Sequence, residues 1–173
     1  MNDPFAHQLR LDQIRDGARI ELTADEEERR DVARRLRLGG IERLDAHAIL
    51  ERSGDVVRAH GRLGASLEQS CVVTGEPVAA HVDEPFALIF MPEPGASAPD
   101  EEVELGEKDC DVIFYDGGSI DLGGAIADSL ALSLDPYPRS AGAEAALREA
   151  GVMSEAEASP FAALAKLMRK DEA

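Results

Sequence analysis

The sequence predicts an α+β protein built on a curved, mainly antiparallel β-sheet, and three observations carry this prediction. Apolar and polar residues alternate between Ile41 and Met91, as they do on strands with one buried face. Runs with helical spacing lie on both sides of this region. Turn residues separate the alternating runs and no helical segment does, so a meander is expected and a parallel sheet is not. We expect about six strands, in an open sheet or a barrel.

The N-terminal part is predicted to form an extended strand followed by a helix. Residues 5–11 carry apolar side chains at positions 5, 9 and 11. A helix over residues 24–38 can be capped by Thr23, has acids in its first turn and arginines toward its end, and is followed by Gly39 and Gly40. The first strand is therefore followed by a helix.

The meander is predicted from the phase of its apolar residues. Ser53-Gly54-Asp55 and Gly75-Glu76-Pro77 are typical turns, residues 71–73 form a further short apolar piece, and Pro85 indicates an edge or a bulge. The predicted inward side chains are Leu44, Ala46, Ala48, Leu50, Val57, Ala59, Leu63, Ala65, Leu67, Val78, Ala80, Val82, Phe86, Leu88 and Phe90.

The C-terminal part is predicted to contain one more strand and several helices. Residues 92–107 have the composition of a mobile acidic loop, and residues 111–115 form a short strand. Asp121 can cap a helix whose apolar residues recur every four positions from Leu122. Two prolines, Pro136 and Pro138, end it. A weak helix follows at 144–150. We expect a single domain over residues 1–158 and a short amphipathic helix over 159–173.

The charge of the chain restricts its partners. The 173 residues carry a formal charge of -17, and residues 92–135 hold 12 acids against Lys108 alone. Such a chain repels a polyanion, so free nucleic acid is a poor candidate partner. The acidic segment is either a solvated loop and face or a docking surface for a cationic protein. No apolar run approaches the roughly 20 residues of a membrane helix, and the N-terminus lacks the features of a signal peptide, so we expect a cytoplasmic protein.

No pattern of catalytic or metal-binding residues is found. Two cysteines, Cys71 and Cys110, and four scattered histidines do not have the spacing of zinc ligands. The paired glycines do not match a phosphate-binding loop. We therefore expect no metal, no cofactor and no enzymatic activity, with a metal-dependent hydrolase or nuclease as the remaining enzyme alternative.

Three stretches in order suggest a family. They are Cys71-Val-Val-Thr-Gly-Glu-Pro77, Gly118-Ser-Ile-Asp-Leu-Gly-Gly124 and Leu132-Ser-Leu-Asp-Pro-Tyr-Pro-Arg139, with an acidic loop between the first two. This arrangement resembles the YceD family of bacterial proteins, named for accumulation of 23S ribosomal RNA. The matching motif residues are Cys71, Thr74, Glu76, Pro77, Asp121, Leu122, Asp135, Pro136, Tyr137 and Pro138.

The resemblance implies a non-enzymatic factor that supports normal levels of large-subunit ribosomal RNA. Many relatives carry a second cysteine where this chain has Thr74, and further cysteines after the proline-rich helix end. Residues 137–142 contain none here. Any zinc binding proposed for cysteine-rich relatives is thus in doubt for this chain.

Two hypotheses for binding follow. The first is contact with a basic ribosomal protein or an assembling large-subunit particle, with ribosomal RNA engaged indirectly. Its candidate residues are Glu101, Glu102, Glu104, Asp121, Tyr137 and Arg139. The alternative is direct RNA binding by the arginine-rich helix at 24–38, through Arg34, Arg35 and Arg37. The low aromatic content, 4%, leaves few platforms for stacking bases and disfavours this alternative.

Overall fold

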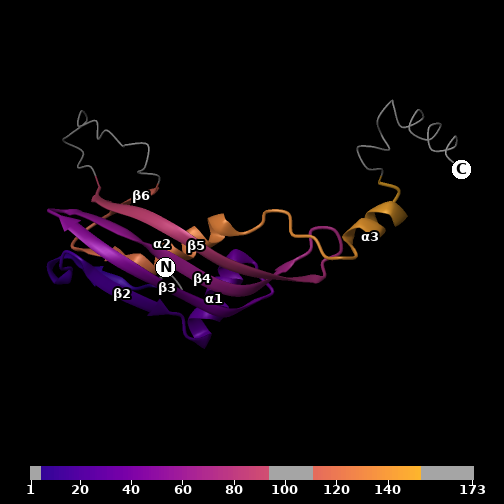
Figure 1. Cartoon of the computed structure of the whole chain (residues 1–173), viewed down its shortest axis with the longest axis horizontal. Coiled ribbons are helices and arrows are strands. Elements are labelled where there is room, and N and C mark those ends of the chain that lie inside the picture. The colour runs from indigo at the N-terminus through magenta and orange to yellow at the C-terminus, as the bar shows by residue number, and fades with distance from the viewer. Residues whose placement is uncertain (1–4, 94–110, 153–173) are drawn as a thin grey trace, which may run out of the picture. The chain divides into compact units, whose positions relative to one another are not determined.

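A computed structural model describes residues 5–93 and 111–152 of the chain (Figure 1). These residues form two compact units. The first comprises the described parts of Met1–Gln69 and Ala79–Pro136, and the second those of Ser70–Val78 and Tyr137–Ala173. Within the described ranges, no helix is long and apolar enough to cross a membrane.

The described residues form strands and helices in a mixed order, with the strands before the last two helices. Their bounds are β1 Gln8–Arg10, the 3-10 turn η1 Leu11–Gln13, β2 Ala18–Thr23, α1 Glu26–Leu36, β3 Gly40–Ser53, β4 Val56–Ser70, β5 Pro77–Pro92, β6 Asp111–Tyr115, β7 Ser119–Asp121, α2 Leu122–Ser133 and α3 Ala143–Glu149. The predicted α+β class, with a mainly antiparallel sheet and C-terminal helices, is confirmed.

The main sheet is open and has the strand order β2-β3-β4-β5-β6, while β1 and β7 form a separate two-stranded sheet. The barrel alternative was therefore wrong. β6 runs parallel to β5, with Phe90 opposite Ile113. The sheet is mainly antiparallel, as predicted. The parallel pairing of β6 was not predicted, because the chain between β5 and β6 gave no helical signal that would indicate a crossover.

The strand with Pro85 illustrates how the sheet accommodates a proline. β5 pairs with β6 only through residues 88–92, so the β6 side of β5 at Pro85 has no strand beside it in the described chain. A proline cannot donate to a strand partner, and this position does not require it to. The prediction of an edge at Pro85 holds locally, although β5 is not an edge strand along its whole length.

One face of the sheet, α1, α2 and β7 enclose the core. The alternating residues of β3 and β4 are buried as predicted, and α2 contributes Leu122, Ile126 and Leu130, all fully buried. Val32 from α1 and Ile120 from β7 complete the same cluster. The four-residue spacing on α2 and the two-residue spacing on the strands therefore identified the two surfaces that meet.

The first helix differs from its prediction at both ends. Asp25, not Thr23, is the N-cap, and its carboxylate accepts from the Glu28 backbone N–H at 2.9 Å while the Glu28 carboxylate accepts from the Asp25 N–H at 2.8 Å. At the other end Arg37 adopts the left-handed conformation, with φ of 57°, before the two glycines are reached. A second strand, β2, which the pattern did not reveal, precedes this helix.

The second helix begins where the sequence predicts. The Asp121 carboxylate accepts from the Gly124 backbone N–H at 3.1 Å. A Cβ on Gly123 would lie 1.9 Å from the carbonyl oxygen of Phe5, so this turn of α2 must be glycine for the N-terminal segment to pass so closely.

The second unit contains the turn that follows β4 and the segment that begins at Tyr137. Residues 72–74 are a turn and Gly75 has a φ of 74°, so the short apolar piece at 71–73 belongs to the turn and not to a strand. α3 matches the predicted weak helix.

Two predictions lie outside the described residues. They are the acidic segment from residue 94 onward, with Glu101, Glu102 and Glu104, and the helix predicted at 159–173.

Candidate partner-binding surfaces

The second unit contains a cluster of four polar side chains, which we call the polar knuckle: Cys71, Thr74, Glu76 and Ser140. A turn holds the first three together, because the Gly75 N–H donates to the Cys71 carbonyl at 2.9 Å. The Cys71 N–H donates in turn to the Glu76 carbonyl at 2.8 Å. Ser140 comes from the segment after Pro138, so two distant parts of the sequence meet in this small unit.

Side-chain hydrogen bonds close the polar knuckle. The Ser140 hydroxyl donates to the Glu76 carboxylate at 2.7 Å, and the Thr74 hydroxyl donates to the same carboxylate at 3.0 Å. The Val72 N–H donates to the Pro138 carbonyl at 2.9 Å, which ties the backbone of the turn to the proline-rich segment. Thr74 and Glu76 therefore act as structural residues of this unit.

Both ionisable groups of the polar knuckle are shifted toward their charged forms. Hydrogen bonds from the Ser140 backbone, and then from Thr74, lower the pKa of the Cys71 thiol to about 6. The hydroxyl groups of Ser140 and Thr74 lower the pKa of the Glu76 carboxyl. Cys71 is only 3% exposed, so a reagent reaches its sulfur poorly despite its acidity.

The residues of the polar knuckle do not fit a structural zinc ion. Such a site needs four thiolate or imidazole ligands, or a closely similar set. The positions that face each other here supply one thiol, one carboxylate and two hydroxyls. In the described ranges no three His, Cys, Asp or Glu side chains are grouped to hold a metal ion. The hydrogen bond from Ser140 to Glu76 joins the two segments of this unit.

The proline-rich segment beside the polar knuckle exposes two of the predicted partner-binding residues. Tyr137 is 71% exposed and Arg139 is exposed, whereas Pro138 between them is buried. Val72, which is bonded to Pro138, is also 53% exposed. An aromatic and an arginine on a segment fixed by a buried proline suit an interface anchor.

Asp121 lies in the first unit and has a structural role. Its Oδ1 accepts from the His7 N–H at 2.9 Å as well as from Gly124, so it links β1 to the start of α2. Leu122 beside it is fully buried. The end of the same helix is held by Gln69, whose side chain donates to the Asp135 carbonyl at 2.9 Å.

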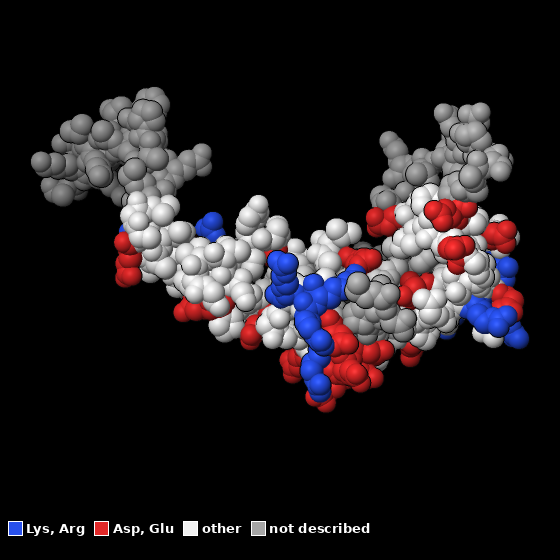
Figure 2. Space-filling model, turned by 180° about the vertical axis from the view of Figure 1, so that it is seen from behind, with Lys and Arg blue, Asp and Glu red and all other residues white. Residues whose placement is uncertain are grey.

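The arginines of α1 are largely paired with nearby acceptors. Arg34 bonds Asp31, and Arg35 bonds Asp128 on α2. Two neighbouring arginines also have acceptors. The Arg30 guanidinium lies 2.6 Å from the Glu26 carboxylate, and the Arg29 guanidinium donates to the Ala24 carbonyl at 2.7 Å. Arg37 is exposed at the helix end. The visible face in Figure 2 shows basic and acidic groups side by side rather than a broad basic area. This charge pairing weakens the support for the RNA-binding alternative.

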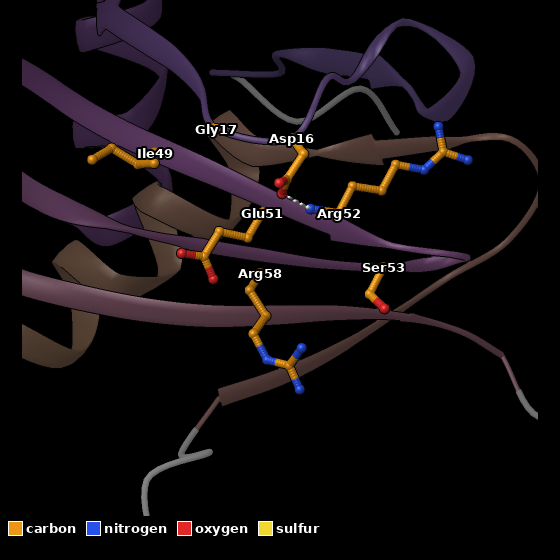
Figure 3. A pocket seen from close by; sticks show the side chains of 7 residues that line it. All are labelled: Asp16, Gly17, Ile49, Glu51, Arg52, Ser53 and Arg58. Atoms are coloured by element: carbon orange, nitrogen blue, oxygen red, sulfur yellow. Dashed lines mark hydrogen bonds between the residues drawn. The ribbon is translucent and has the colours of Figure 1, made fainter.

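A hollow near one end of the sheet carries charges of both signs. It has a volume of about 340 Å³ and is lined by Asp16, Glu51, Arg52 and Arg58 among others. Figure 3 shows Arg52 pointing away from Glu51 and Arg58, with its backbone N–H donating to Asp16 at 3.1 Å. The described residues that line this hollow include Ser53 and no histidine or cysteine that could activate its hydroxyl.

The sequence did not identify Ser140 as a site residue. A serine after a proline-rich segment has no distinctive spacing, and only the packing of that segment against the turn at 71–76 shows its role. By contrast, Cys71, Thr74 and Glu76 were identified as motif residues, and the structure brings them together.

The fold and these surfaces define an α+β protein whose mainly antiparallel sheet is covered on one face by helices. A family model, described as large ribosomal RNA subunit accumulation protein YceD, matches residues 59–168. The chain belongs to the YceD family. Neither the search of curated proteins nor that of solved structures gave a significant match.

Proposed function

We propose that this protein is a non-enzymatic factor in biogenesis of the large ribosomal subunit and supports accumulation of 23S ribosomal RNA. The observation that carries the proposal is the family match over residues 59–168, which includes all three motifs and the acidic segment. The protein acts by binding a basic ribosomal protein or the assembling particle.

The distribution of charge supports a cationic partner. Residues 92–135 have a net charge of -11, while residues 136–173 have a net charge of only -1. A concentrated negative surface accelerates encounter with a cationic protein and disfavours contact with RNA phosphates. Glu101, Glu102, Glu104, Tyr137 and Arg139 are the proposed contact residues.

The test is co-purification of the tagged full-length protein from its own cells at low and moderate salt, with proteins and RNA identified in the eluate. We expect large-subunit proteins or particles in the eluate, and a lowered ratio of 23S to 16S ribosomal RNA in cells lacking the gene. An unchanged ratio together with no large-subunit component in the eluate would refute the proposal.

A charge-matched pair of variants tests the acidic contact. Changing Glu101, Glu102 and Glu104 to Gln should reduce co-purification and make it less sensitive to salt. The control replaces three exposed acids of the sheet, Glu21, Glu51 and Glu84, by Gln, which removes the same charge elsewhere. Equal loss in both variants would mean that total charge, not the acidic segment, governs binding.

A further inference from the structure

β6 is an edge strand with an exposed side. It is last in the sheet order β2-β3-β4-β5-β6, and within the described ranges no strand lies along its outer side. In a parallel pair, alternate residues direct both backbone groups to the same neighbour. The Tyr115 carbonyl accepts from the Glu93 N–H at 3.0 Å, so Tyr115 and Ile113 face β5. The N–H and C=O groups of Val112 and Phe114 consequently point to the free edge.

A groove runs beside this edge within the first unit. It has a volume of about 330 Å³ and lies between β6, the two-stranded sheet and the first turns of α2. Phe90, Ile113, Phe114 and Ala125 supply its apolar lining. Phe114 is 57% exposed, so its ring is available to a partner that enters the groove.

The groove is also acidic. Among the described residues that line it are three carboxylates, those of Asp116, Asp121 and Asp128, and no Lys, Arg or His. Asp116 is exposed, whereas Asp128 is bonded to Arg35 and Asp121 caps α2. A free strand edge, an apolar floor and an acidic rim therefore coincide at one place.

We propose that the β6 edge binds an extended, cationic segment of a partner protein by strand addition. This inference rests on the proposed function and identifies where and how the basic partner is held. The backbone groups of Val112 and Phe114 form up to four hydrogen bonds with the segment. Apolar side chains of the segment enter the groove, and its Lys or Arg side chains meet the acidic rim.

The sign of charge selects this occupant over the others. A second copy of the chain carries -17, and residues 94–110 of this chain hold six acids against one lysine, so both are repelled by the acidic rim. RNA phosphates are repelled for the same reason. A cationic extended segment alone matches both the backbone edge and the charge.

The direct test is hydrogen exchange on the full-length protein. The probe is a synthetic ten-residue peptide of alternating Lys and Val, and the control peptide alternates Glu and Val. With the Lys-Val peptide bound, exchange of the Val112 and Phe114 amides should slow at least about tenfold. The Ile113 and Tyr115 amides, already bonded to β5, should change little. Unchanged exchange at Val112 and Phe114 with the peptide bound would overturn the proposal.

A proline substitution blocks the edge without removing a bond to β5. Val112→Pro deletes one outward N–H at a position where an edge strand tolerates proline. Val112→Ile is the matched control, because it keeps that N–H. We expect fluorescence anisotropy to show about tenfold weaker peptide binding for Val112→Pro and an affinity within about twofold of wild type for Val112→Ile. Equal affinities in a folded Val112→Pro protein would contradict strand addition.

Charge variants provide a measurement that does not alter the strand. Replacing Asp116 and Asp128 by Asn should weaken peptide binding more than replacing Glu21 and Glu51 by Gln, which removes the same charge from the sheet elsewhere. An equal effect of the two variants would show that the rim does not select the peptide. Sedimentation of wild type and Val112→Pro identifies self-pairing, since a dimer lost in Val112→Pro would overturn the proposal.

Strand addition at β6 and the proposed function can be refuted by different results. If Val112→Pro still co-purifies with large-subunit components as well as wild type does, the β6 edge is not the binding site and the proposed function stands. If wild type binds the Lys-Val peptide at β6 but neither co-purifies with large-subunit components nor affects 23S ribosomal RNA, the proposed function fails instead.

Discussion

The motif residue Asp121 allows a structural role to be separated from a partner-binding role by two substitutions. Its Oδ1 accepts from the N–H groups of His7 and Gly124, which joins β1 to α2. Asp121→Ala removes the cap, which costs about 1 kcal/mol, and leaves the His7 N–H without its acceptor, which costs about 1 to 2 kcal/mol more. Asp121→Asn keeps an oxygen at the same place and loses only the favourable charge at the helix start, under about 1 kcal/mol.

Thermal unfolding followed by circular dichroism measures this difference. For a chain of this size, about 2 to 3 kcal/mol corresponds to a decrease in Tm of roughly 4 to 12 °C for Asp121→Ala. Asp121→Asn should stay within about 4 °C of wild type. Equal Tm values for wild type and Asp121→Ala would refute the structural role.

The same pair of variants separates the two roles in a binding assay. If Asp121→Asn is as stable as predicted but no longer co-purifies with large-subunit components, the carboxylate contacts the partner. If Asp121→Asn binds as wild type does, the motif aspartate serves the fold alone.

Three further predictions concern other parts of the molecule. In a Cys110→Ser background, thiolate absorbance at 240 nm should titrate Cys71 near pH 6 rather than near its ordinary value of 9.0, and a midpoint above 8 would disprove the hydrogen-bonded thiolate. Because the folded pKa is the lower one, this thiolate stabilises the fold fully above pH 9.0 and the contribution is lost as the pH falls through about 6. Gly61→Ala should lower the free energy of unfolding by more than about 2 kcal/mol in urea titrations, since its Cβ would lie 1.8 Å from the His47 carbonyl oxygen; wild-type stability would contradict that packing. Removing divalent metals with EDTA should leave the Tm unchanged, and a decrease would show that a metal ion stabilises the protein.

Residue periodicity was sufficient to predict the layers of this fold, because burial of one face imposes a period on each element. Leu44 and Leu50 on β3, and Ile126 and Leu130 on α2, were assigned to the core from spacing alone and are buried. Asp121 was assigned as a cap from its position before an apolar run, and the structure confirms it. Burial of one face and capping of a helix depend on residues close together in the sequence. A pattern of neighbouring residues is therefore enough to predict them.

The sequence by itself determined the class of fold, the inward faces, the cap of α2 and the concentration of acid in one quarter of the chain. Only the tertiary structure decided that β6 runs parallel to β5, that Ser140 meets Glu76, and that Arg35 is bonded to Asp128. Each of these is a contact between residues far apart in the chain. No local pattern specifies such a pairing, because it depends on how whole elements pack and not on which residues are neighbours in sequence.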